Sequence, residues 1–214
     1  MGSGGAGGQP NKIILFDGST DDFYWGWSSV RNGSANPWRY NDDGTMTVAA
    51  NAGHIQSEQT FRNVFVHVEY MTAKTSFAGG GQSRGNSGVL LNGSYELQIL
   101  SLEAFSDPQP MEATCGAVFG LTAPLEVACY AEELWNTYEI EFRAPLCDGP
   151  NSVVTPARFV EVKLNGRLIH RDVDVHQATI GGQSESCEPR GLVLQDWSSI
   201  LPVSFRNIWA IPRD

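Results

Sequence analysis

The chain has 214 residues, of which 41% are hydrophobic and 18% are charged, and its formal net charge is −10. A surface of that sign repels phosphate backbones and anionic lipid headgroups, so nucleic acids and membrane surfaces are poor partners, whereas neutral sugars are compatible with it. No apolar run approaches the roughly 20 residues that a membrane-spanning helix needs. The length suits one large β domain with its own core.

Residues 1–10, MGSGGAGGQP, are rich in glycine and serine and have nothing to pack. They are typical of a flexible tether, which could be an expression scar, the remnant of a trimmed signal or the segment after a lipid-anchored cysteine. No repeat or further linker follows. We therefore expect residues 11–214 to form a single domain.

Strand patterns dominate the chain. Apolar and polar residues alternate at 65–70, 138–143 and 159–164, as expected for strands with one wet face and one buried face. The alternation predicts an all-β fold, a two-sheet antiparallel sandwich, with five side chains inside: Ile140, Phe142, Val160, Val162 and Leu164.

The Asn-Gly pair at 92–93 lies between two apolar runs and predicts a two-residue hairpin turn. With that turn, Val89 lies opposite Glu96, and Ser87 lies opposite Gln98. Side chains directly opposite one another share a face, so a carboxylate, an amide and a hydroxyl would converge there. This face is a candidate floor for sugar binding or catalysis. An edge hairpin with an ordinary solvated face explains the pattern equally well.

The chain has four cysteines, Cys115, Cys129, Cys147 and Cys187, and their spacing is too irregular for a zinc ribbon. Three disulfide pairings are possible. We favour Cys115–Cys129 and Cys147–Cys187, because each closes a loop-rich segment between strands. The alternative is four buried thiols in a cytosolic protein, although the even count favours an oxidising compartment.

Near the C-terminus, an apolar strand at 191–195 ends in Asp196 and Trp197. Side chains at the end of a strand often contact ligands, although a turn residue beside a half-buried core tryptophan is an alternative. Arg206, within 205–209, is either a buried ion-pair partner for a site carboxylate or an ordinary strand-face arginine.

Seven spaced blocks of the sequence resemble the 3-keto-disaccharide hydrolase domain family over roughly residues 12–212. They are LFDG at 15–18 with GW at 26–27, GNSG at 85–88, YELQI at 95–99, ELWNTY at 133–138, LNG at 164–166, LQD at 194–196 and FRNI at 205–208. The resemblance implies a concanavalin-like jelly roll, related in shape to the glucanases of glycoside hydrolase family 16. It also implies an exported bacterial protein (periplasmic, surface-anchored or secreted) that acts on glycosides.

The sequence departs from these relatives in three places, one of which is Asn92, where relatives often have an arginine at the hairpin turn. The glucanase motif carries two glutamates and an aspartate on one strand, whereas the corresponding strand here offers Glu96, then Gln98, then Leu100. A retaining glycosidase needs two carboxyls about 5–5.5 Å apart, which this strand does not supply. Many relatives also have a histidine after the Gln-Asp pair, where this chain has Trp197.

One carboxylate suffices for a 3-keto glycoside, because the ketone acidifies the C2 proton. A base removes that proton, the C1 oxygen leaves, and water adds back to the enone. The resemblance then implies Glu96 as the base and Asp196 as the group that protonates the leaving group or orients water. Gln98, Arg206 or a bound divalent cation such as calcium would stabilise the enolate oxygen.

The predicted function is cleavage of glycosidic bonds, of 3-keto glycosides or disaccharides, by elimination–hydration or hydrolysis, and the alternative is a non-catalytic carbohydrate-binding module. A structural or adhesion domain is a third option. No metal site is predicted from the residues, and the expected partner is a small carbohydrate bound by a monomer or weak homo-oligomer. The predicted substrate-binding residues are Ser87, Gln98, Asn86, Trp135, Gln195, Trp197 and Arg206.

Overall fold

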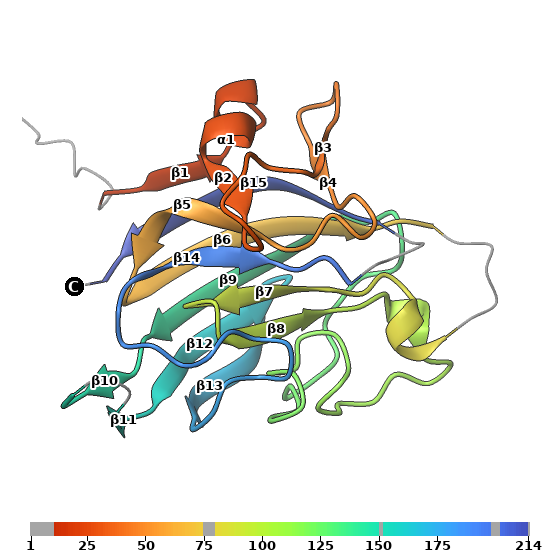
Figure 1. The fold of residues 1–214 in the computed structure, drawn as a ribbon. Coiled ribbons are helices and arrows are strands. Elements are labelled where there is room, and N and C mark those ends of the chain that lie inside the picture. Colours follow the sequence, from red (N-terminus) through yellow and green to blue (C-terminus); the bar gives the residue numbers. More distant parts are fainter. Residues whose placement is uncertain (1–10, 75–79, 150–151, 198–201, 214) are drawn as a thin grey trace, which may run out of the picture.

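The computed structural model describes residues 11–74, 80–149, 152–197 and 202–213, so the tether predicted at 1–10 lies outside the described residues. The larger of its two main sheets has eight strands within this part of the chain (Figure 1). In spatial order they are β13 (Arg167–Val175), β12 (Ala157–Leu164), β9 (Asn136–Arg143), β6 (Val64–Thr72), β15 (Val203–Pro212), β4 (Met46–Thr47) and β3 (Arg39–Tyr40), with β1 (Ile13–Phe16) paired to β15.

The smaller sheet has five described strands, in the order β2 (Trp27–Ser29), β5 (Ile55–Phe61), β14 (Arg190–Leu194), β7 (Ser87–Leu91) and β8 (Tyr95–Ile99). A separate hairpin pairs β10 (Leu146–Cys147) with β11 (Val153–Thr155) and extends away from the body of the molecule (Figure 1). The described helices are short: α1 (Thr20–Trp25) and the 3-10 turns η1 (Gly81–Ser83) and η2 (Leu102–Ala104). No helix in the described ranges is long and apolar enough to cross a membrane.

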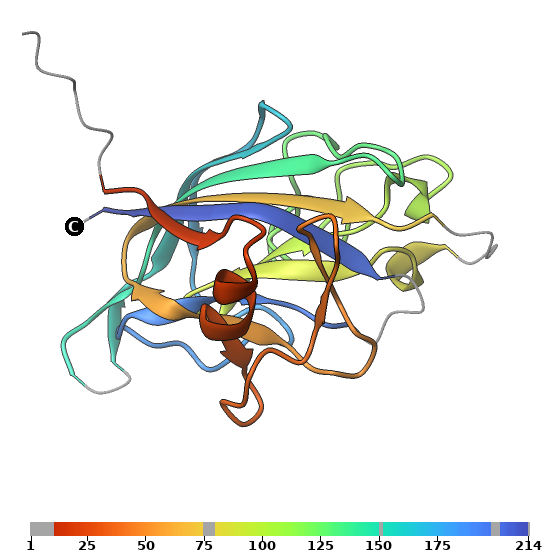
Figure 2. The same cartoon turned by 90° about the horizontal axis from the view of Figure 1, so that it is seen from above.

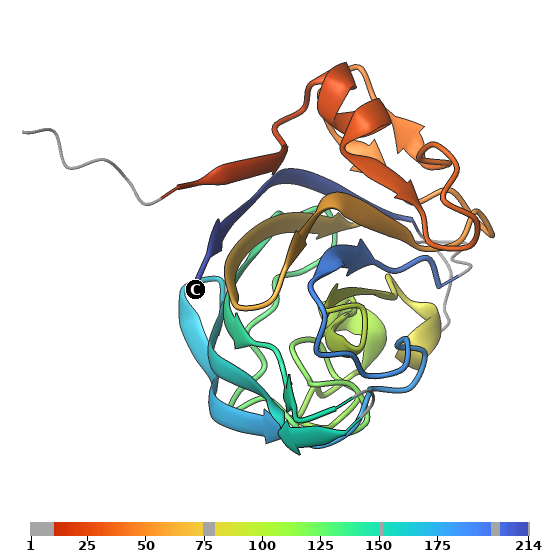
Figure 3. The same cartoon turned by 60° about the vertical axis from the view of Figure 1, so that its left-hand side comes forward.

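The two sheets stack face to face, and the larger one curves around one side of the smaller one (Figure 3). Seen from above, β1 runs beside β15, and α1 lies outside the sheets (Figure 2). The core fills the space between the sheets, with Phe142 and Phe205 from the larger sheet and Tyr95 and Leu97 from the smaller one. All of the strand pairs within the two sheets are antiparallel, which confirms the predicted jelly-roll sandwich.

The predicted alternation holds along β9 but changes partway along β12. Ile140 and Phe142 are fully buried, as predicted. In β12 the register shifts between Phe159 and Glu161, so that Phe159 and Val162 both point inward while Val160 is only partly buried. The prediction that Val160 lies in the core is therefore wrong, because a bulge interrupts the two-residue period of the strand.

The hairpin of β7 and β8 also departs from the predicted register. Asn92 and Gly93 both have positive φ, 52° and 67°, as a tight turn requires. However, Leu91 pairs with Tyr95, which leaves Ser94 as an additional loop residue. This shift by one residue exchanges which side chains share a face across the hairpin.

Both predicted disulfides are present. Cys115 is bonded to Cys129, and Cys147 is bonded to Cys187. The first closes the irregular segment between β8 and β9, and the second ties the β10–β11 hairpin to the irregular segment that precedes β14. The first bond therefore constrains one irregular segment internally, and the second joins another to the separate hairpin.

Candidate functional site

The candidate site lies on the outer face of the smaller sheet. On β8, Tyr95 and Leu97 point into the core, so Glu96 and Gln98 point away from it. Glu96 lies opposite Leu90, and Gln98 lies opposite Gly88. Glu96 and Gln98 therefore share one face, as predicted, although their partners on β7 differ from the predicted ones.

The Glu96 carboxylate occupies the space above Gly88. A Cβ atom built on Gly88 would lie 2.5 Å from Glu96 Oε1, closer than real Cβ contacts allow. Beyond Gly88, Gln195 Nε2 donates a hydrogen bond of 3.0 Å to Glu96 Oε2. The missing side chain at Gly88 therefore lets Glu96 reach across β7 to the residue that follows β14, and the space is filled by this carboxylate itself.

Burial is the main influence on the pKa of the Glu96 carboxyl group. The Glu96 side chain is almost completely buried, with 1% of its surface exposed. Loss of hydration disfavours the charged form and raises the pKa of Glu96 to about 8, while the hydrogen bond from Gln195 lowers the pKa slightly in return. Glu96 is thus a protonated acid through much of the neutral range and becomes a base near its upper end.

Glu96 and Gln98 begin a row of polar side chains on the outer face of the smaller sheet. A network of amide side chains extends this row. Gln98 Nε2 donates to Gln82 Oε1 over 2.7 Å, and Asn86 Nδ2 donates to the same oxygen over 3.0 Å. Gln82 lies in η1, so this turn links Asn86 to the site. The Oε1 atoms of Gln98 and Gln195 are buried and have no hydrogen-bond partner within the described parts of the chain.

Two irregular segments border this row. Residues 116–119 run beside β8, where Phe119 N–H donates to the Glu96 carbonyl. From the segment before β14, Thr179 Oγ1 accepts the Glu96 N–H over 3.0 Å. A substrate reaches the carboxyl group of Glu96 only if part of this border moves, since the side chain is buried as the structure stands.

The open end of the row lies where the chain leaves β14. Asp196 accepts a hydrogen bond from Gly53 N–H through Oδ2 at 2.9 Å, and its own N–H donates to His54 Nδ1 over 3.1 Å. Burial lowers the pKa of His54, with the Asp196 charge opposing. Neutral His54 then carries its hydrogen on Nε2, because Nδ1 accepts. Trp197, next along the chain, is half-exposed.

Sequence reasoning missed His54. It precedes β5 and lies 142 positions from Asp196 along the chain, and the two meet because β5 and β14 are neighbours in the sheet. The only indication in the sequence was that a polar residue stands directly before a strand. Such residues are too common to distinguish His54 from the other three histidines.

Three predicted site residues lie elsewhere. Ser87 is paired with Ile99 and faces the core, where its hydroxyl donates to the Gln195 carbonyl over 2.7 Å. The prediction that Ser87 shares a face with Glu96 is therefore wrong, because the hairpin register is shifted by one residue. Ser87 instead supports the backbone of Gln195 from the core side.

Arg206 and Trp135 lie on the opposite side of the sandwich from Glu96. On β15, Phe205 points into the core, so Arg206 points outward from the larger sheet and binds Glu69 over 2.6 Å. Its guanidinium lies 3.9 Å from the ring centre of Trp135. Of the two alternatives for Arg206, an ion pair with the site carboxylate is wrong, and an ordinary strand-face arginine is what the structure has.

A hard cation in this row would take its ligands from the oxygens of Glu96, Gln98 and Gln195, since calcium binds carboxylate and amide carbonyl oxygens. The described residues contain no group of three or more His, Cys, Asp or Glu placed to hold a metal ion. The chemistry that these residues themselves supply is proton transfer by one carboxyl group with amide and imidazole donors nearby.

Solved structures share this fold over nearly the whole chain. A candidate glycosyl hydrolase from Parabacteroides distasonis is 31% identical, with a TM-score of 0.83 over 94% of this chain and 84% of that one. A second from the same organism is 16% identical, with a TM-score of 0.65 over 95% and 94%. The alginate lyase Aly36B is 11% identical, with a TM-score of 0.52 over 94% and 96%.

These comparisons place the protein among jelly-roll sandwiches with a carbohydrate-related function. The chain belongs to the 3-keto-alpha-glucoside-1,2-lyase-like domain family, whose model matches residues 11–211. No protein of curated function matches the sequence significantly.

Proposed function

We propose that this protein is a carbohydrate-active enzyme that cleaves the glycosidic bond of 3-keto glycosides, by elimination and rehydration or by net hydrolysis. The observation that carries the proposal is the buried Glu96 carboxyl, whose pKa is raised to about 8 by loss of hydration. A general base works best when its pKa lies near the working pH. Membership of the family supports the 3-keto glycoside as substrate class.

The ketone makes a single base sufficient. Ionised Glu96 takes the C2 proton, and the electron pair of that C–H bond forms an enolate with the C3 ketone. Collapse of the enolate forms a C1–C2 double bond and expels the C1 oxygen, which takes up a proton as it leaves. Water then adds at C1, returning a free 3-keto sugar. With its pKa raised to about 8, the smaller part of Glu96 is ionised at pH 7, and the base form increases as the pH rises toward 8.

The neighbouring groups have distinct roles in this proposal. Gln195 holds the Glu96 carboxylate through its hydrogen bond of 3.0 Å. The amide of Gln98, on the same face of β8 as Glu96, is the donor for the enolate oxygen. Asp196 and the Nε2–H of His54, at the open end of the row, orient water or the leaving group. Trp197, 51% exposed at the open end of the row, is a stacking surface for a sugar ring.

The second candidate function is carbohydrate binding without turnover. The burial of Glu96, with 1% of its surface exposed, favours this alternative, because a sugar can contact Trp197 while the carboxyl stays covered. Binding of a sugar without release of its aglycone identifies this function.

The direct test compares a 3-keto-α-glucoside carrying a chromogenic aglycone with its parent α-glucoside. We expect aglycone release from the keto substrate alone, and deuterium from heavy water at C2 of recovered substrate or product if elimination occurs. Equal release from both substrates contradicts the role of the ketone. The same assay with EDTA shows whether a divalent cation takes part.

We also infer that the protein is exported. Two disulfides join all four cysteines, and such bonds persist mainly in oxidising compartments. Peptide mapping under non-reducing conditions should find both disulfides in protein isolated from its native source. Four free thiols would contradict an exported location.

A further inference from the structure

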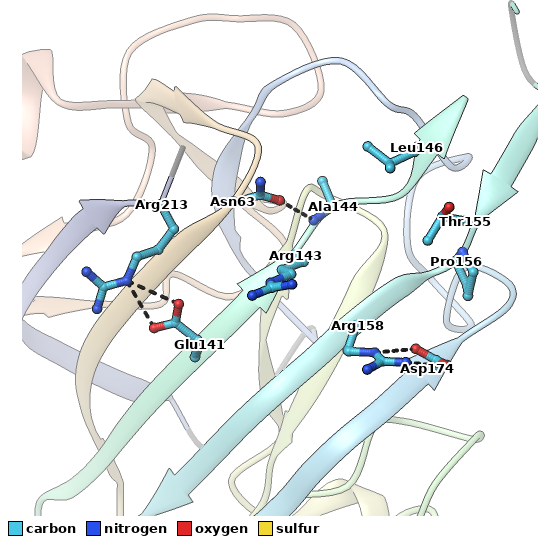
Figure 4. A pocket seen from close by; sticks show the side chains of 10 residues that line it. All are labelled: Asn63, Glu141, Arg143, Ala144, Leu146, Thr155, Pro156, Arg158, Asp174 and Arg213. Atoms are coloured by element: carbon cyan, nitrogen blue, oxygen red, sulfur yellow. Dashed lines mark hydrogen bonds and ion pairs between the residues drawn. The ribbon is translucent and has the colours of Figure 1, made fainter. Parts of the chain in front are cut away.

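A cavity of about 770 Å³ lies on the outer face of the larger sheet, on the far side of the sandwich from Glu96. Its floor is formed by the ends of β9, β12 and β13, and the β10–β11 hairpin forms one wall (Figure 4). Three arginines and two carboxylates line it, so the lining carries one net positive charge. This is unusual for a chain whose formal net charge is −10.

Both carboxylates are already paired. Arg158 binds Asp174 through two hydrogen bonds, of 2.6 Å and 2.9 Å, and Arg213 Nε lies 3.1 Å from both oxygens of Glu141. The side chain of Arg143 has no hydrogen bond or ion pair to another described residue. Figure 4 shows its guanidinium between the two pairs, so the unpaired charge lies in the middle of the cavity.

The register places this charge beside another of the same sign. Arg143 on β9 lies directly opposite Arg158 on β12, and like charges at directly opposed positions destabilise a sheet. Asp174 compensates the charge of Arg158, and Asp172 Oδ1 lies 3.6 Å from Arg158 Nη1. The uncompensated charge of the two is therefore that of Arg143, and a guanidinium group binds a carboxylate through paired hydrogen bonds.

The wall of the cavity is mostly apolar, with Thr155 of β11 as its polar residue. Leu146 on β10 is 48% exposed, and Ala144 and Pro156 line the cavity beside it. A ligand that fits this site has an anionic group for Arg143 and a compact ring whose C–H groups pack against Leu146. A hexuronic acid unit has both features.

We propose that this cavity is a second binding site, which takes the carboxylate of a uronic acid unit on the Arg143 guanidinium and packs the sugar ring against Leu146. The saccharide part of the ligand rests on the proposed function. The anion site itself rests on the arginines, and its test measures binding, whereas the proposed function is tested by turnover.

Isothermal titration calorimetry with glucuronate, glucose and acetate tests the proposal on the whole chain. We expect glucuronate to bind more tightly than acetate, and glucose not to bind at this site. Arg143→Gln should weaken glucuronate binding about tenfold or more, because a charge-assisted hydrogen bond is lost. Leu146→Ser should weaken glucuronate but leave acetate unchanged.

The matched control is Arg171→Gln, which removes an exposed arginine of β13 that pairs with Glu161 outside the cavity. It should leave glucuronate binding within about twofold of the unmodified protein, since surface charges at a distance are screened. Equal binding of glucose and glucuronate, acetate as tight as glucuronate, or equal losses in the two arginine variants would overturn the proposal. Turnover of the 3-keto substrate should be unchanged by Arg143→Gln.

Discussion

Glu96 owes its chemistry to its position on the sheet. Its backbone is held by hydrogen bonds to Thr179 and Phe119, and its carboxylate lies above Gly88 within reach of Gln195. The amide of Gln195 is neutral and can hold either protonation state of the carboxyl. Loss of hydration therefore sets the pKa of Glu96, which is raised to about 8.

This pKa predicts a dependence of stability on pH. Below about pH 4.5 the carboxyl is protonated in both states, whereas between about pH 4.5 and 8 the unfolded chain releases its proton and the folded chain keeps it. The contribution of Glu96 to the free energy of unfolding therefore falls with rising pH in that interval, by at most about 1.4 kcal/mol per pH unit, and levels off above it.

Urea denaturation of the unmodified protein and Glu96→Gln, at several pH values from about 5 to 9, measures this contribution. The variant should gain stability relative to the unmodified protein as the pH rises to about 8. Glu161→Gln is the control, because Lys163 and Arg171 neighbour that exposed carboxylate and lower its pKa. A difference between Glu96→Gln and the unmodified protein that does not change with pH would contradict the raised pKa.

Individual site residues could be predicted from sequence only where local pattern decided their orientation. Glu96 and Gln98 occupy alternate positions of β8, between core positions such as Tyr95 and Leu97, and this alternation is visible in the sequence. Arg206 could not be oriented, because its direction depends on which face of β15 packs inward. His54 could not be found, because its contact with Asp196 depends on the order of strands in the sheet.

At the scale of elements, the β7–β8 hairpin determines what surrounds Glu96. The Asn-Gly pair predicted the turn correctly, but its register depended on the extra loop residue, Ser94. Ser94 is fully buried, and its hydroxyl donates to Ser184 in the segment before β14. The β12 bulge beside Val160 is similar, since no residue pattern in the strand marks it.

Gly88→Ala tests the close approach of β7 to the carboxylate. The added methyl group would lie 2.5 Å from Glu96 Oε1, so the carboxylate must move away from Gln195. We expect a loss of about 1–3 kcal/mol in the free energy of unfolding, as for other overpacked sites, and loss of most activity on the 3-keto substrate. Gly149→Ala is the control, because a Cβ there meets nothing within 4 Å. Full activity of Gly88→Ala would show that the Glu96–Gln195 contact is dispensable.

For the whole molecule, the two disulfides stabilise the fold to different extents. They close segments with sequence separations of 14 and 40 residues. In the chain-entropy model, the longer loop loses about 0.9 kcal/mol more unfolded-state entropy at 25 °C. The Cys147→Ser/Cys187→Ser protein should therefore be less stable than Cys115→Ser/Cys129→Ser by about that amount.

Denaturation midpoints and slopes of the two double variants, compared with the unmodified protein, measure this difference. Each should lose about 2–5 kcal/mol. The reverse order of stability would mean that contacts of the irregular segment between β8 and β9, rather than chain entropy, dominate the effect.

The sandwich holds the buried carboxyl of Glu96 above Gly88 and has the half-exposed Trp197 two residues after Gln195, in a domain of the 3-keto-alpha-glucoside-1,2-lyase-like family. The central claim is that Glu96 transfers the proton in glycoside cleavage. Glu96→Gln preserves the size of the side chain and its hydrogen bonding but removes proton transfer.

The most direct test compares the turnover of a 3-keto-α-glucoside by the unmodified protein and by Glu96→Gln at about pH 8. Substrate affinity is measured on the same samples. We expect turnover to fall by about 10²–10⁴ while the dissociation constant changes by no more than a few-fold. Turnover that is unchanged in Glu96→Gln, whatever its stability, would contradict the role of Glu96.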